Sequence, residues 1–211
     1  TFRDNFSADN NTSPELLFVA AQDGANTQTW GGMTFLTHAG CGGAMSAGNY
    51  GIDYCWGGYR MKQQAYRRYG TGDGRAAFFF TPDSALAHND TLPNGQPAQT
   101  DSVISIGDFH HGIPAPKFTN KKSTGAGGQQ TTMVDTDFPI FRLADAYLIY
   151  AEANIRGGGG SAANALTYLN LVRQRAYGNP SANFGALPVV DTILAERGRA
   201  LLFEAGRRPA L

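Results

Sequence analysis

The residue types best suited to chemistry gather in one stretch, where aromatic rings alternate with amides over residues 25–60. The side chains that could form a binding site there are Trp30, Asn49, Tyr50, Tyr54 and Trp56. Flat rings stack on the apolar C–H face of a sugar, and nearby amides hydrogen-bond its hydroxyls. The same rings could instead be the hydrophobic anchors of a region with few other apolar residues. The stretch therefore predicts a carbohydrate-binding site, with packing as the alternative.

Two carboxylates offer a second kind of chemistry. Asp145 and Glu152 are seven residues apart, so on a helix they share nearly the same face, as the acid and nucleophile of a glycosidase could. Arginines nearby match the acids in number and position, and bidentate Arg–carboxylate pairs tie helices together. We favour a structural ion-pair network, and no catalytic residue is predicted.

Metal and nucleophile motifs lack the required spacing. His110 and His111 are adjacent, so in an extended segment they point in opposite directions, and no HExxH or CxxC pattern accompanies them. Ser46 lies in a glycine-rich stretch that resembles G-x-S-x-G, but the first glycine stands one position too early. We expect no metal, no cofactor and no serine nucleophile.

Composition excludes several classes of protein. The 211 residues carry 17 basic and 17 acidic side chains, and this balance disfavours a nucleic-acid binder. Hydrophobic residues make up 42% of the chain, enough for a core, but no apolar run approaches the roughly 20 residues of a membrane helix. Cys41 and Cys55 could form one disulfide in an exported protein or remain buried thiols. No targeting signal is visible, so we interpret the chain as a processed product or an excised piece.

Glycine content divides the chain into a loop-rich portion, 1–137, and a helical portion, 138–211, expected to form one structural unit. Most of the 27 glycines lie before residue 129. In the loop-rich portion we expect an ordered loop over 25–58 and a buried strand or helical turn at 16–20. We also expect a helix at 60–69 and strands at 76–80 and 103–106.

Helical periodicity begins at Phe138, where Pro139 suits the first turn of a helix. Residues 157–160 are four glycines that end this helix, and Ser161 is an N-cap for the next. The second helix runs to Tyr177 and Gly178, and a third begins near residue 191 and ends near residue 206.

Three ordered motifs occupy residues 138–153 (FPIFRLADAYLIYAEA), 169–176 (LNLVRQRA) and 193–204 with the Arg207–Arg208 pair. Together they resemble a known family, the SusD/RagB-like lipoproteins. Shorter matches occur at residues 13–18, 28–32, 56–60 and 72–75. The resemblance spans nearly all of this chain but only the C-terminal half of the family pattern. The chain departs from the pattern at Ala210, where an aspartate is expected.

The resemblance implies a fold and a function. The fold is mainly α, a SusD-like tetratricopeptide-type helical scaffold with long ordered loops and a few short strands. Such proteins are surface-exposed lipoproteins of the bacterial outer membrane, which bind oligosaccharides and deliver them to a SusC-like TonB-dependent transporter without catalysis. Their glycan contacts vary between members, so the site residues above rest on ring chemistry. Two alternatives stay open, a glycoside hydrolase and a transporter-docking scaffold without a sugar site.

Overall fold

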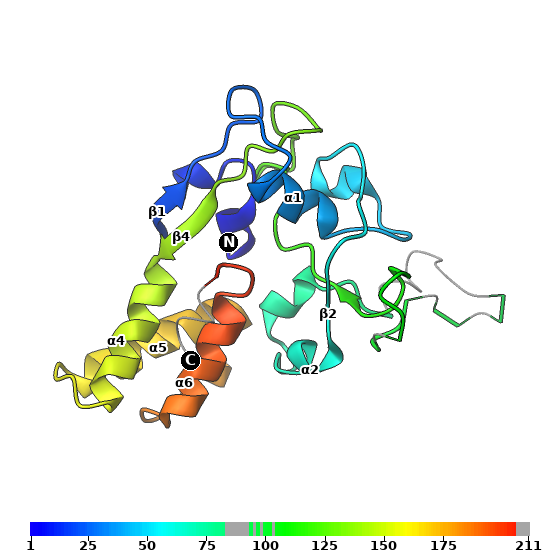
Figure 1. Cartoon of the computed structure of the whole chain (residues 1–211). Helices are drawn as coiled ribbons and strands as arrows, with labels where there is room; N and C mark the ends of the chain where they lie inside the picture. Colours follow the sequence, from blue (N-terminus) through cyan, green and yellow to red (C-terminus); the bar gives the residue numbers. More distant parts are fainter. Residues whose placement is uncertain (83–92, 95, 98, 103, 206–211) are drawn as a thin grey trace.

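A computed structural model describes residues 1–82, 93–94, 96–97, 99–102 and 104–205. The architecture is mainly helical with a few short strands and long loops, as the sequence predicts (Figure 1). The helices are α1 Gly32–Ala39, α2 Gln63–Tyr66, α4 Leu143–Ile155, α5 Ala162–Tyr177 and α6 Val190–Ala200. The strands are β1 Leu16–Ala20, β2 Arg60–Met61, β3 Ile113–Pro114 and β4 Phe138–Arg142. Short 3₁₀ turns include η3 Ala47–Tyr50 and η4 Gly74–Phe78. None of the described helices is both long and apolar enough to cross a membrane.

Helices α4, α5 and α6 pack around one hydrophobic core (Figure 1). Ser161 caps α5 by accepting a hydrogen bond from the backbone N–H of Asn164, and Gly178 ends the helix in a left-handed conformation, with φ of 69°. Both predicted ends of this helix are therefore confirmed. The predicted end of α6 near residue 206 is wrong. The helix stops at Ala200, where the carbonyls of Ala200 and Leu202 accept hydrogen bonds from Arg142 and Lys117.

The predicted start of the first long helix at Phe138 is also wrong. Residues 138–142 form strand β4, which pairs antiparallel with β1, and the chain turns directly into α4 at Leu143. Pro139 lies in this two-stranded ribbon, where a missing N–H is tolerated because both strands are edges. Strand β1 itself is confirmed, but it is not buried, since Leu17 and Phe18 are 56% and 59% exposed.

The loop-rich portion has hydrophobic clusters of its own. One gathers rings and methionines from distant segments, Phe6, Met33, Met45, Phe78, Phe80 and Phe118 among them. A smaller cluster surrounds the β2–β3 pair and holds Phe79. The predicted strand at 76–80 is wrong, because its first half lies in η4 while its phenylalanines enter these two clusters.

Other expectations for the loop-rich portion are corrected as well. Helix α1 lies inside the stretch predicted to be loop. The helix expected over 60–69 shortens to α2, because Arg60 and Met61 pair with β3. Of the predicted strand at 103–106, Val103 lies outside the described residues, and Ile104 and Ile106 lie exposed outside any strand.

Candidate functional site

Three aromatic side chains from separate segments meet at the surface beside α1. The centroid of the Trp56 ring lies 6.1 Å from that of Trp30 and 6.3 Å from that of Phe35, and the planes of Trp30 and Trp56 are inclined by 40°. Trp30 is 63% exposed and Phe35 is 47% exposed, whereas Trp56 is half-buried. We call Trp30, Phe35 and Trp56 the aromatic platform. Tyr54, two residues before Trp56, is 70% exposed.

The loop that carries Trp56 is fastened to the C-terminal end of α1. The backbone N–H of Trp56 donates to the carbonyl of His38 at 2.9 Å, and that of Gly58 donates to the carbonyl of Ala39 at 3.0 Å. A disulfide joins Cys41 to Cys55, which decides the question that the sequence left open. The loop is therefore ordered by α1 rather than by its own residues.

His38 lies beneath the platform. Its buried ring stacks on Trp56, with centroids 4.6 Å apart and planes inclined by 27°. Its Nδ1 lies 2.7 Å from the carbonyl oxygen of Tyr54, and its Nε2 lies 3.0 Å from that of Thr132. Neither His38 nor Phe35 is among the site residues predicted from the sequence. A histidine and a phenylalanine in a predicted loop give no local signal of a ring neighbour about 20 residues away.

The structure does not bring the other two candidate residues to this place. The Tyr50 side chain packs against the core cluster of Phe6 and Phe118, and this burial raises the pKa of its hydroxyl to about 12. Asn49 is exposed and lines a hollow of about 260 Å³ together with Arg3 and Lys121. Among the described residues, neither shares a ring contact or hydrogen bond with the platform.

Comparison with known proteins decides the family. The model of the SusD family matches residues 14–209, which is nearly the whole chain. The chain belongs to the SusD family. This confirms the resemblance seen in the three helical motifs.

Individual relatives agree with this membership. The chain is 37% identical over 94 residues to the starch-binding protein SusD of Bacteroides thetaiotaomicron, a match that covers 44% of this chain and 16% of that protein. Surface glycan-binding protein A of the same species superposes with a TM-score of 0.71 at 22% identity, over all of this chain and 44% of that one. Its complex with laminarihexaose gives a TM-score of 0.70 at 23% identity, over 99% of this chain and 44% of that one. This SusD-family chain therefore spans less than half the length of these relatives.

The two carboxylates that resemble a glycosidase pair are both engaged by one arginine in this SusD-family chain. Arg197 lies 2.9 Å from Asp145 and 3.9 Å from Glu152, and Glu152 also pairs with Arg156 at 2.8 Å. Burial raises the pKa of Asp145, and the Arg197 charge opposes that rise. Each acid is thus directed at a guanidinium within the helical portion, as the structural interpretation predicts.

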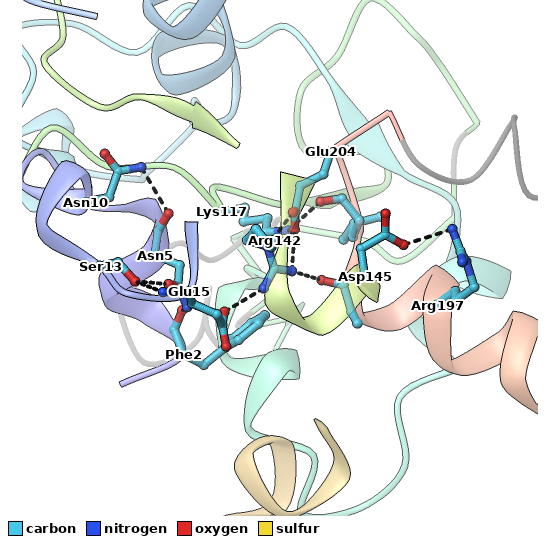
Figure 2. A network of polar contacts seen from close by, with 12 residues as sticks. Phe2, Asn5, Asn10, Ser13, Glu15, Lys117, Arg142, Asp145, Arg197 and Glu204 are labelled. Atoms are coloured by element: carbon cyan, nitrogen blue, oxygen red, sulfur yellow. Dashed lines mark hydrogen bonds and ion pairs between the residues drawn. The ribbon is translucent and has the colours of Figure 1, made fainter. Parts of the chain in front are cut away.

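A larger network centres on Arg142, the last residue of β4 (Figure 2). Its guanidinium lies 2.5 Å from Glu204 and 2.7 Å from Glu15, and the ammonium of Lys117 also contacts Glu204. Arg175, which lies in α5, also pairs with Glu15. These pairs connect the ribbon, the loop-rich portion, α5 and the segment that follows α6, so they act as framework.

The described residues contain no group of three or more His, Cys, Asp or Glu side chains arranged to hold a metal ion. His110 instead pairs with Asp108, its Nδ1 lying 2.9 Å from a carboxylate oxygen. Hydrogen bonds from the backbone and ring of His110 lower the pKa of Asp108. Ser46 is exposed just before η3.

Proposed function

We propose that this chain is a non-catalytic glycan-binding protein that holds oligosaccharides on the aromatic platform. The observation that carries this proposal is the exposure of Trp30 and Phe35 beside Trp56, with the exposed Tyr54 two residues before Trp56 in the chain. Large exposed rings that adjoin one another mark interaction sites rather than ordinary surface. Membership of the SusD family supports the proposal, as do a starch-binding relative and a relative solved with laminarihexaose.

The chemistry of the platform is reversible stacking. Each exposed ring presents a π-face to the C–H face of a pyranose, and the apolar area that leaves water contributes to affinity. The proposal includes Trp30, Tyr54 and Trp56. It does not need Tyr50, whose ring is part of the core, or Asn49, which faces another hollow. Asp145 and Glu152 are not assigned to catalysis, because Arg197 holds both.

We further propose a cellular location and a protein partner. The family resemblance implies a protein at the surface of the bacterial outer membrane that hands glycans to a SusC-like TonB-dependent transporter. One similar structure, free and with laminarihexaose, is that of a surface glycan-binding protein, and this supports the cellular location. The partner rests on the resemblance alone.

Affinity electrophoresis through gels containing starch, laminarin and other polysaccharides tests the binding. We expect at least one polymer to retard the chain. Trp30→Ala should weaken that retention by about fivefold to tenfold, since a ring contact contributes about 1 kcal/mol beyond area burial. Phe18→Ala is the matched control, because Phe18 is a comparably exposed ring on β1.

Two outcomes would contradict this proposal. Retention by no polymer would remove the glycan-binding function from this chain. Equal losses in Trp30→Ala and Phe18→Ala would show that the platform is not the site. Far-ultraviolet circular dichroism of each variant separates loss of binding from loss of fold.

An exposed apolar ribbon favours a second candidate function, docking to the transporter. Phe18 and Phe141 stack across β1 and β4 with centroids 6.4 Å apart, and Leu17 and Ile140 are also exposed. A surface of this kind is typical of protein–protein contacts. Co-purification with a co-expressed SusC-like transporter in the absence of glycan would support docking, and its persistence in Phe18→Ser/Phe141→Ser would exclude the ribbon.

A further inference from the structure

His38 connects three segments of the candidate site from below. It lies in the last turn of α1, it is fully buried, and its ring stacks on Trp56. The same ring reaches the carbonyl oxygens of Tyr54 and Thr132, at 2.7 and 3.0 Å.

Counting protons shows which form of the ring can satisfy both contacts. A carbonyl oxygen only accepts hydrogen bonds, and a neutral imidazole has one N–H. Both contacts are hydrogen bonds only when both nitrogens of His38 carry a proton, which makes the ring a cation. The geometry therefore fits the imidazolium and leaves one carbonyl without a donor when the ring is neutral.

The surroundings favour a cation at this place. The negative end of the α1 dipole lies close to His38, and the indole face of Trp56 attracts a positive ring. The Tyr54 loop contributes Asp53, whose Oδ1 lies 3.9 Å from Nδ1 and whose Oδ2 accepts a hydrogen bond from Thr132 at 2.5 Å. The Trp56 ring and the Thr132 segment bring no further ion-pair partner to the ring among the described residues.

We propose that protonated His38 is the positioning residue of the aromatic platform, holding Trp56 and the Tyr54 loop in the geometry that binds glycan. This inference rests on the proposed function and adds a regulator to it. Loss of a proton releases either the Tyr54 or the Thr132 carbonyl and weakens the stack on Trp56. Glycan affinity is thus highest when His38 is charged and decreases as the pH rises through its deprotonation.

Nuclear magnetic resonance of the unmutated chain tests the protonation. Long-range ¹H–¹⁵N correlations separate an imidazolium from either neutral tautomer, and contacts to the Trp56 ring assign the His38 signals. We expect two protonated nitrogens at about pH 5.5 and a change in the Trp56 indole signal when one proton leaves as the pH is raised. A neutral His38 at about pH 5.5, or a Trp56 signal indifferent to its deprotonation, would overturn the proposal.

Fluorescence tests the link to Trp56. The sequence has two tryptophans, so Trp30→Phe leaves Trp56 as the sole indole emitter. A protonated imidazole in contact with indole quenches its emission more than a neutral one, so the emission should rise with pH. His38→Gln should abolish this rise, while the matched control His110→Gln/His111→Gln should keep it. The same rise in the His38→Gln background would contradict the proposal.

Glycan titration completes the test with laminarihexaose and maltohexaose as probes. The unmutated chain should bind at least one probe about fivefold more weakly at about pH 8 than at about pH 5.5. His38→Gln should bind with one pH-independent, weakened affinity, and equal affinity at both pH values in the unmutated chain would overturn the proposal. Binding of neither probe at either pH, in a chain that no polysaccharide retards, would refute the proposed function, and the spectroscopic results would then decide the role of His38 alone.

Discussion

At the scale of single residues, the ion-pair network around Arg142 contains more cations than carboxylates. Three cations, Lys117, Arg142 and Arg175, share two carboxylates, Glu15 and Glu204. Burial lowers the pKa of Lys117 to about 8, because the attraction of Glu204 does not fully offset desolvation and the neighbouring arginines. Lys117 is therefore the member of this network that gives up its proton first.

The lowered pKa of Lys117 leads us to expect that the protein becomes more stable as the pH rises above neutrality. The unfolded chain keeps this proton up to the ordinary pKa of 10.5, whereas the folded chain loses it near 8. Between these values the unfolded state binds more protons, so the free energy of unfolding contributed by Lys117 rises with pH. Urea titrations between about pH 7.5 and 10 should show this rise in the parent chain and in Lys62→Met, but not in Lys117→Met.

Buried tyrosines set the upper limit of that window. Burial raises the pKa of Tyr59 and Tyr69 well above the usual value of 10, so the unfolded chain ionises these hydroxyls first. Above about pH 10 these tyrosines therefore lower the free energy of unfolding as the pH rises, which is opposite to the effect of Lys117. A flat profile below pH 10 in the parent chain would show that Lys117 keeps its charge in the folded state.

Residue type predicts part of the candidate site. Trp30, Tyr54 and Trp56 could be chosen from ring chemistry, and the structure exposes two of them and half-exposes the third. The sequence could not separate them from Tyr50, because a tyrosine in a loop looks the same whether its ring meets water or Phe6. His38 could not be predicted from the sequence either, because its role depends on three neighbours that only the fold brings together.

At the scale of elements, local signals predict what local interactions create. The cap at Ser161, the glycine at 178 and the apolar stripe between them specify α5 without outside help. Strand β4 differs, because its pairing partner β1 lies about 120 residues earlier. Local periodicity extends helix back to Phe138, and only the tertiary partner stops it at Leu143. The strand predicted at 76–80 is wrong for a similar reason, since the phenylalanines of this segment pack into two separate hydrophobic clusters.

The Cys41–Cys55 disulfide should stabilise the connection between α1 and the Trp56 loop. It closes a short loop with a sequence separation of 14, for which chain entropy predicts about 3 kcal/mol. Cys41→Ala/Cys55→Ala should lower the free energy of unfolding by about that amount, and reductant should reproduce the loss in the parent chain but have no effect on the variant. Equal stability of the oxidised parent and the variant would mean that the backbone hydrogen bonds to α1 suffice.

At the scale of the whole molecule, buried ion pairs join the two portions. Arg142 reaches Glu15, Lys117 reaches Glu204, and Arg75 reaches Glu196 at 2.7 Å, so each pair has one partner before residue 138 and one after it. The core of α4–α6 is separate from the two hydrophobic clusters of the loop-rich portion, but Phe203 packs against both of those clusters and so also joins the portions. Charge thus supports the prediction that residues 1–211 form one structural unit.

Glu204→Gln tests that unity. The change leaves Arg142 and Lys117 without their shared carboxylate in a buried place, and breaking such a pair costs about 3–5 kcal/mol. Glu152→Gln, which alters pairs nearer the surface, should cost about 1 kcal/mol. If the two portions unfold as one, hydrogen exchange should show α5 amides and the amides around Phe118 losing protection together in Glu204→Gln. If α5 kept its protection while the loop-rich portion exchanged, the ion pairs would be joining two separately stable halves.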